Sequence, residues 1–473
     1  MAAEEAPVLS GAHPFHFPVY WERAEWLLQG PHTLSGADSL PDWRASELEV
    51  AIVDRWRSLH GPPGGASGGD GSPVFKYRLG SEREPLETRP LPGRLGMVAQ
   101  KALGRAGKRK PPAAIRKVAT LRDPAAFSFG DARWSELLLA FDGPPVSALA
   151  PPSLPAADAS APLLPRGGEE GGRSVELPAH SVLVNVAPFC AFHFVLATDL
   201  AELQPQVLTE RSLRVALGFV RHFSRFLRLT YNSLGAGASV NHLHWQGMYF
   251  REPLPIELRP RRRQARRGAL LLEAVEGWPL EAWAFTAGAG SDPEELAAAV
   301  FPLVQRFLEW NLAHNLCLVN SDGAVRLFIF ARRLANFPDP SHTQVAATEA
   351  LGYWIVPRQE EYESLTAQDA AALMASVAAW GANGSLVVQE VLAPSGWVFD
   401  PAPSGGSREG AVHPAAFPPT VASLGDLEPE RAQSGDLARG AAAFSEPPVA
   451  LVMGAAVVTA AALLLYGAKL KQT

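Results

Sequence analysis

The chain has 473 residues, of which 47% are hydrophobic, so it is long enough to bury a substantial core. Its formal net charge of −6 provides no overall positive field, which argues against nucleic acid as a partner. Two cysteines are too few for a disulfide framework or a four-cysteine zinc site. The 42 prolines and 41 glycines exceed average usage, which indicates that part of the length is linker.

Composition separates a folded body from segments with few large apolar residues. We expect an N-terminal extension over residues 1–43 and a body over residues 44–393. Stretches rich in proline, glycine, serine and alanine predict disordered insertions near 61–73 and 151–172, and a disordered linker over 394–448.

Within the body, residues 175–199 predict two strands broken at Pro188, and residues 208–227 predict a helix with Thr209 as its N-cap. Residues 227–250 then predict a strand, a glycine loop and a strand. A second helix is expected over 293–313, followed by strand pairs over 314–333 and 349–362. This order predicts an α+β fold in which helices pack on an antiparallel sheet. The arginine-rich run 259–267 predicts a solvated loop, with contact to anionic lipid as the alternative.

An uncharged apolar run, Val449–Ala468, stands near the end of the sequence. A helix of about 20 residues matches the hydrocarbon thickness of a bilayer. The run therefore predicts a transmembrane tail anchor, with a cytosolic body held at an intracellular membrane. The alternative is a buried, alanine-rich helix.

The stretch ASVNHLHWQGMYF, Ala238–Phe250, carries polar residues at every second position. Side chains alternate between the two faces of a strand, so His242, His244 and Gln246 are expected on one face. Leu243 and Trp245 then form an apolar backing on the other face.

Two imidazoles on one face support more than one chemistry. They can bind a metal, for which His193 is the nearest third ligand, or one of them can act as a nucleophile toward phosphorus. A plain structural strand is the third reading. The small, uncharged loop before the strand favours the nucleophile, because its backbone N–H groups can approach phosphate oxygens closely. That loop contains Asn232, Ser233, Gly235, Gly237 and Ser239.

VNHLHWQ resembles the His-x-His-x-Gln motif of the transferase branch of the histidine-triad superfamily. Together with LPGRLGMVAQ (91–100), VNVAPFCAFHFVLA (184–197), YNSLGAGASVNHLHWQGMYF (231–250) and AHNLCLVN (313–320), it resembles the family of GDP-L-galactose and GDP-D-glucose phosphorylases. The resemblance covers roughly residues 75–362. It implies a histidine-triad-like antiparallel sheet, with two pseudo-repeated halves left open.

The resemblance also implies a reaction, namely phosphorolysis of GDP-L-galactose to L-galactose-1-phosphate and GDP, early in ascorbate synthesis. His244 would attack the α-phosphorus to form a guanylyl-histidine, His242 would orient it, and Gln246 would donate to a phosphoryl oxygen. The implied substrate-binding residues are Asn185, His193, Asn232, Gly235, Gly237 and Ser239. No cofactor and no metal are implied.

Some positions depart from the family pattern. Phe192 stands where most relatives have glycine, and KALGR follows Gln100 where Leu-Asn-Glu-Gly-Arg is common. Alternatives therefore stay open at this point: GDP-D-glucose or another nucleotide sugar as substrate, or an inactive protein that binds a nucleotide or a metal. A homodimer is likewise an open expectation.

Overall fold

The structure is a computed structural model that describes residues 47–60, 74–76, 79, 87–105, 115–142, 160–164, 179–250, 252–288, 291–321, 324–335, 342–380 and 384–401. All of these belong to one compact unit, residues 1–421. The expected N-terminal extension, the insertion at 61–73 and most of the insertion at 151–172 lie outside the described residues. So do nearly all of the linker at 394–448 and the whole apolar run 449–468.

A large antiparallel sheet dominates the part of the chain that the structure describes. Its eleven strands lie in the order β14-β8-β9-β10-β12-β11-β6-β7-β5-β4-β3. In that order their bounds are Val398–Phe399, Arg261–Arg267, Leu270–Val275, Ala282–Ala287, Ala324–Arg332, Ala313–Ser321, Leu227–Asn232, His244–Tyr249, Phe194–Ala197, His180–Val184 and Leu137–Phe141.

The same strand order occurs twice within this sheet. The order β4-β5-β7-β6 in the first half returns as β9-β10-β12-β11 in the second. A helix follows the second strand of each half: α3 (Glu210–Arg221) and α4 (Pro293–Glu309). The halves meet where β6 pairs with β11, with Asn232 opposite Asn315. Two asparagines that are far apart in sequence therefore face each other at the centre of the sheet.

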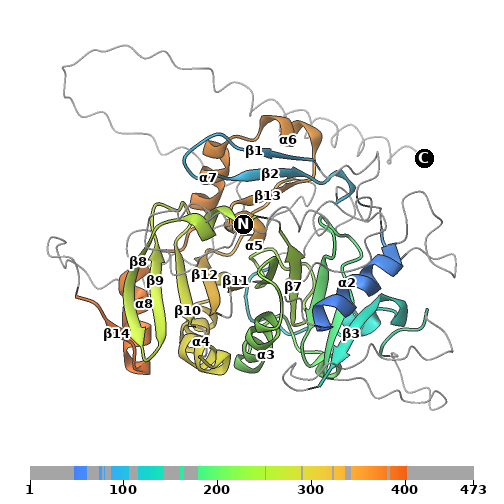
Figure 1. The fold of residues 1–473 in the computed structure, drawn as a ribbon, viewed down its shortest axis with the longest axis horizontal. Helices are drawn as coiled ribbons and strands as arrows, with labels where there is room; N and C mark the ends of the chain where they lie inside the picture. The colour runs from blue at the N-terminus through green and yellow to red at the C-terminus, as the bar shows by residue number, and fades with distance from the viewer. Residues whose placement is uncertain are drawn as a thin grey trace, which may run out of the picture. The chain divides into compact units, whose positions relative to one another are not determined.

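Helices cover one face of the large sheet (Figure 1). α3 begins at the predicted N-cap, because the side chain of Thr209 accepts a hydrogen bond from the Ser212 N–H. Leu213, Leu217 and Val220 of this helix are buried in the main core. α4 packs beside α3, and α2 (Glu47–His60) and α8 (Gly384–Leu392) contribute to the same core.

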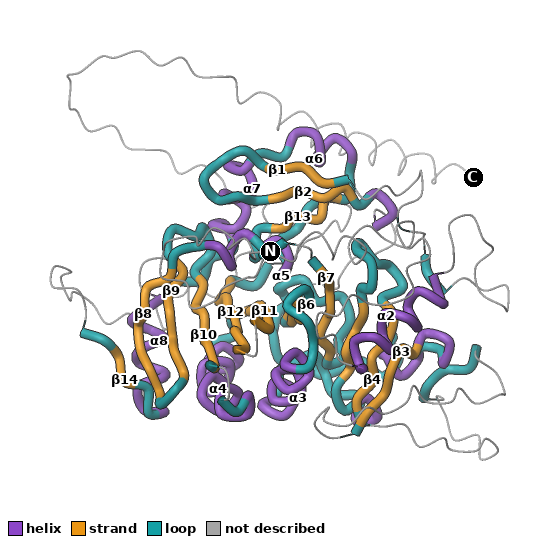
Figure 2. Tube along the Cα trace, in the orientation of Figure 1, coloured by secondary structure: helices purple, strands orange, loops and turns teal. Residues whose placement is uncertain are grey.

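The other face carries a second core beneath a small sheet (Figure 2). This sheet has the order β1-β2-β13, with bounds Thr88–Pro90, Val98–Lys101 and Tyr353–Val356. Three short helices accompany it: α5 (Ala347–Ala350), α6 (Gln359–Ser364) and α7 (Ala367–Ser376). The predicted strand pair at 349–362 is therefore wrong, since one short strand and parts of two helices occupy it.

The predicted fold class needs correction because it included a transmembrane helix. The structure is a mixed α/β fold built on a large antiparallel sheet. A spanning helix needs about 20 apolar residues, and no helix among the described residues is both long and apolar enough to cross a bilayer. The longest of them, α4, has 17 residues and carries Glu294, Glu295 and Arg306. This finding contradicts the predicted tail anchor and the membrane location; Val449–Ala468 itself lies outside the described residues.

The arginine-rich run is also corrected, since Arg261–Arg267 forms strand β8 instead of a loop. Two of its charges have partners just beyond the ends of the neighbouring strands β9 and β14. Arg262 pairs with Glu276 at 3.2 Å, and Arg263 pairs with Asp400 at 2.8 Å. Charged, paired side chains on a strand near the edge of a sheet discourage further strand addition.

Candidate active site

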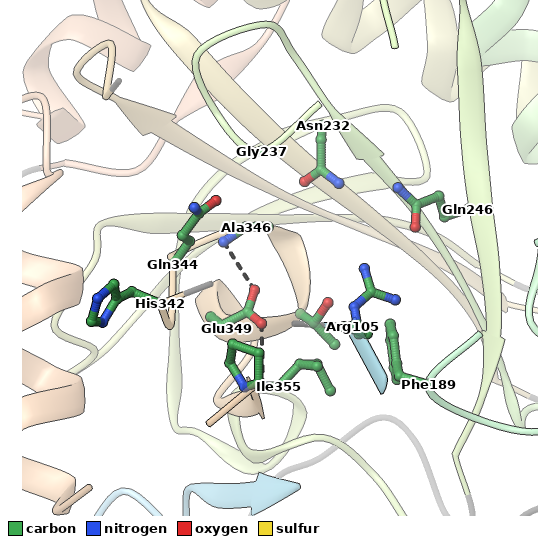
Figure 3. Close-up of a pocket in the computed structure, with 12 residues that line it drawn as sticks. Arg105, Phe189, Asn232, Gly237, Gln246, His342, Gln344, Ala346, Glu349 and Ile355 are labelled. Atoms are coloured by element: carbon green, nitrogen blue, oxygen red, sulfur yellow. Dashed lines mark hydrogen bonds between the residues drawn. The ribbon is translucent and has the colours of Figure 1, made fainter. Parts of the chain in front are cut away.

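Strand β7 places the polar and apolar residues of the motif on opposite faces, as the alternation predicts. Trp245 is fully buried in the core beneath α3, where its indole N–H donates to Ser212 Oγ at 3.0 Å. Gln246 lines a cavity on the other face (Figure 3). His244 is the first residue of the strand and is 4% exposed. His242 lies just before the strand and is fully buried.

The surroundings of His244 fix its tautomer. Its Nδ1 lies 2.7 Å from the carbonyl oxygen of His242 and 2.9 Å from Oε1 of Gln206. Both neighbours are acceptors, so Nδ1 carries the proton and Nε2 keeps the lone pair. Burial lowers the pKa of His244 to about 4, with the bond to the His242 carbonyl opposing the shift. The ring is therefore neutral at neutral pH, and Nε2 is the nucleophilic nitrogen.

His242 has the opposite tautomer. The backbone N–H of Phe129 donates to its Nδ1 at 2.9 Å, so the proton of the neutral ring sits on Nε2. That Nε2 is buried and has no hydrogen-bond partner among the described residues. Burial, more than the neighbouring His244, lowers the pKa of His242 to about 3. The ring of Phe129 lies against both imidazoles, 5.6 Å from His242 and 4.8 Å from His244 between centroids.

His193 connects Asn185 to Gln246. Its Nε2 is 3.0 Å from Nδ2 of Asn185 and 3.2 Å from Oε1 of Gln246. Oδ1 of Asn185 accepts from the Ala187 N–H at 3.0 Å, which fixes the orientation of that amide. Burial and then the charge of Arg105 lower the pKa of His193 to about 3. His193 thus touches the motif glutamine through its side chain.

Asn232 ends strand β6 and is held from behind. Its Oδ1 accepts from Nδ2 of Asn315 at 2.6 Å and from the Ala347 N–H at 2.9 Å. With the oxygen occupied, the Asn232 NH₂ group is the part that faces the cavity (Figure 3). Asn315 is itself held by Arg332, whose Nη1 donates to its Oδ1 at 2.8 Å. A buried chain of side chains therefore aims the Asn232 amide.

The loop after Asn232 needs glycine at two positions. Gly235 and Gly237 have φ values of +75° and +105°, which favour a residue without a Cβ. A Cβ at Gly237 would also lie 2.6 Å from Cβ of Ala346. Gly237 lines the cavity, whereas Ser239 is exposed and lies outside the cavity lining. The structure thus places Asn232 and Gly237 in the cavity lining, whereas Gly235 and Ser239 lie outside it.

The cavity beside Gln246 encloses about 560 Å³, open solvent included. Its lining combines the two site amides with a cation and polar side chains from distant segments: Arg105, Phe189, Asn232, Gly237, Gln246, His342, Gln344, Ala346, Thr348, Glu349, Ile355 and Pro357. No group of three or more His, Cys, Asp or Glu residues placed to hold a metal was found within the described ranges.

Sequence reasoning missed Gln206, a fully buried residue in the loop before α3. Its Oε1 accepts from the backbone N–H of His244 at 2.8 Å and also meets Nδ1 of the ring. Its Nε2 donates to the carbonyl oxygens of Asn232, at 2.8 Å, and His244, at 3.1 Å. Gln206 therefore ties the end of β6 to the start of β7. A lone glutamine after a proline carries no local signal for such a role.

Comparison with known proteins gives the family. Profiles described as "GDPGP1-like, N-terminal domain" and "GDPGP1-like, C-terminal domain" match residues 168–248 and 255–383. Human GDP-D-glucose phosphorylase 1 is 30% identical over 315 residues, which cover 64% of this chain and 74% of that protein. The chain belongs to the GDPGP1-like family. Arabidopsis thaliana GDP-L-galactose phosphorylase 1 is 27% identical, over 64% of this chain and 66% of its own length.

Membership of the GDPGP1-like family confirms the resemblance seen in the motifs, and it confirms an enzyme of the nucleotidyltransferase type. The first profile ends at residue 248 in β7, and the second begins at residue 255, before β8. Each profile therefore covers one of the repeated halves of the sheet. Among solved structures, yeast Ap4A phosphorylase Apa2 aligns with a TM-score of 0.45 at 14% identity, over 70% of this chain and 94% of its own. No finding supports the expected homodimer.

Proposed function

We propose that this GDPGP1-like chain is a GDP-hexose phosphorylase that works through a guanylyl-histidine on His244. The observation that carries the proposal is the pairing of Nδ1 of His244 with two acceptors, which leaves the Nε2 lone pair for attack. The lowered pKa keeps that lone pair unprotonated at neutral pH. The relatives named as GDP-hexose phosphorylases support the substrate class.

In the first step, Nε2 of His244 attacks the α-phosphorus of the GDP-hexose. The bond from that phosphorus to the bridging oxygen breaks, and hexose-1-phosphate leaves. Inorganic phosphate then attacks the same phosphorus, the P–N bond breaks, and GDP forms with free His244. The Nε2–H of His242 and the amide groups of Asn232 and Gln246 are the donors proposed to stabilise the phosphoryl oxygens.

Which hexose the enzyme prefers is a separate question from the reaction that it catalyses. GDP-L-galactose is the substrate that the sequence motifs favour. GDP-D-glucose is the second candidate, because the human relative at 30% identity is named for it. Specificity is a ratio of kcat/KM values, so both substrates need to be measured on one preparation.

The purified chain, incubated with inorganic phosphate and either GDP-hexose, is expected to release GDP and the matching hexose-1-phosphate. Anion-exchange chromatography quantifies both products, and a higher kcat/KM for GDP-L-galactose is the expected order. The reverse order would assign the chain to GDP-D-glucose. Failure to consume either compound would refute the proposed function.

Gln206→Glu is expected to change the pH dependence of the reaction. The new carboxylate places a negative charge beside Nδ1 of His244, which favours the imidazolium and raises the pKa of that ring above about 4. Because attack needs the neutral ring, the acid limb of kcat/KM should move to higher pH. Loss of the two Nε2–H donors should also lower kcat/KM at pH 7 by about 10²-fold through misplacement of the nucleophile.

The matched control is Gln204→Glu, the same substitution two residues earlier. Among the described residues, the side chain of Gln204 hydrogen-bonds to Glu202, which is not a residue of the site. Its pH profile should superimpose on that of the wild type between pH 4.5 and 8, with circular dichroism confirming the fold at each pH. An unshifted acid limb in Gln206→Glu would show that Gln206 does not set the protonation of His244.

A further inference from the structure

Arg105 is a cation at the wall of the cavity. Its Nη1 donates to the Ala187 carbonyl oxygen at 2.7 Å, and its guanidinium lies 5.3 Å from the ring centroid of Phe189. Within the described residues no carboxylate forms an ion pair with it. The other N–H groups of the Arg105 guanidinium have no hydrogen-bond acceptor among the described residues. Figure 3 shows the guanidinium turned toward the amide groups of Gln246 and Asn232.

The amide of Asn232 presents a donor near Arg105. Its Oδ1 is occupied by Asn315 and the Ala347 N–H, which turns its NH₂ group into the cavity. The amide of Gln246 lines the same cavity (Figure 3). A guanidinium and an NH₂ group around one space form a donor set suited to a phosphate.

One carboxylate, Glu349, also lines the cavity. Both of its oxygens accept backbone hydrogen bonds, Oε2 from the Ala346 N–H at 2.9 Å and Oε1 from the Ile355 N–H at 3.2 Å. Its charge is therefore partly compensated by the backbone, and it forms no ion pair with Arg105 within the described ranges. The cavity has a cationic end at Arg105 and an acidic, polar end at Glu349.

We propose that Arg105, with the amide of Asn232, forms the subsite for the phosphate group that leaves and enters during the reaction. The inference rests on the proposed function and names an anion-binding residue for it. His244 occupies one apical position at the α-phosphorus in both steps. In-line displacement places the departing hexose-1-phosphate and the attacking inorganic phosphate at the opposite apex in turn. One subsite must then hold the phosphate of both.

In each of the two steps, one bond to the α-phosphorus forms and one breaks. In the first step the α-phosphorus gains a bond to Nε2 of His244 and loses its bond to the bridging oxygen, which stays with the hexose phosphate. In the second step an oxygen of inorganic phosphate bonds to the α-phosphorus. The P–N bond breaks, and its electron pair returns to Nε2 of His244. Arg105 keeps its proton throughout and acts as a fixed positive charge.

Binding of inorganic phosphate and of hexose-1-phosphate, each alone, tests the inference without turnover. A ³¹P NMR titration should show binding of both to the wild type. Arg105→Gln is expected to weaken each by about 10- to 100-fold, the effect of losing a charge-assisted contact. Arg105→Lys keeps the charge but loses the planar fork, and an intermediate loss is expected. Arg105→Lys is the more conservative substitution, so it still tests the subsite if Arg105→Gln fails to fold.

Arg306→Gln is the matched control, since Arg306 lies on α4 and pairs there with Glu309. It should bind both phosphates as the wild type does. In turnover, Arg105→Gln should raise the KM for phosphate, while hydrolysis of the guanylyl-enzyme by water stays unchanged. Equal phosphate affinity in Arg105→Gln and wild type, or no binding by the wild type at millimolar concentration, would overturn the subsite. A wild type that binds phosphate but turns over no GDP-hexose would instead refute the proposed function alone.

Discussion

Replacing His244 with alanine is expected to lower kcat for GDP-hexose phosphorolysis by about 10⁴- to 10⁶-fold, the loss seen when a covalent nucleophile is removed. Of the imidazoles described near this site, His244 alone has its Nδ1 bound to acceptors, which leaves the Nε2 lone pair for attack. The ring of His242 receives the Phe129 N–H at Nδ1 and carries its proton on Nε2, so its tautomer suits donation instead of attack. Steady-state assays with both GDP-hexoses measure the loss.

The fold of this variant should stay intact, because Oε1 of Gln206 still accepts from the backbone N–H of residue 244. Thermal unfolding and circular dichroism check this. His222→Ala provides the control, since His222 is a partly exposed residue at the C-cap of α3, outside the site. Its kcat should equal that of the wild type. Turnover at the wild-type rate in His244→Ala would rule out the covalent role.

Trp245→Ala, one residue further along the same strand, is expected to have a different effect. The indole is fully buried between β7 and α3, and its N–H donates to Ser212 Oγ. Truncation of a buried tryptophan leaves a cavity and costs about 3–5 kcal/mol of unfolding free energy. It also removes one hydrogen bond to the buried Ser212 hydroxyl, which keeps the one from Thr198. Chemical denaturation should report this loss, together with a fall in Tm of roughly 10 °C.

Trp245→Phe is the graded control. It keeps most of the buried ring and loses the indole N–H, so its loss of stability should be smaller than that of the alanine variant. Because Trp245 points away from the cavity, the folded fraction of either variant should retain most of the wild-type kcat. A Trp245→Ala protein as stable as the wild type would contradict the assignment of this face to the core.

Patterns among residues close together in the sequence predicted the two faces of β7 and the start of α3. The alternation along β7 placed Gln246 and Trp245 on opposite faces because the strand period is two. Thr209 marked the start of α3 because its hydroxyl can satisfy an N–H of the first turn. Asn232 was also predicted near the site, and it lies there because the end of β6 is beside the start of β7 in an antiparallel pair.

The features that the sequence did not predict depend on contacts between residues far apart in the chain. Gln206 and Arg105 reach the site from separate loops, and their roles depend on backbone groups that only the fold brings near. The run at 259–267 became strand β8 because partners on β9 and β14 pair with it, and these partners cannot be read from the run alone. Ser239 resembled a phosphate ligand by its place in a glycine-rich loop, yet it is exposed.

Trapping the covalent intermediate tests the proposed mechanism. The protein is mixed with a labelled GDP-hexose in the absence of phosphate, quenched at alkaline pH to preserve a P–N bond, digested, and mapped by mass spectrometry. We expect GMP attached to His244, no adduct on His242, and loss of the label when phosphate is added. Hexose-1-phosphate accumulating while residue 244 stays unmodified would contradict it.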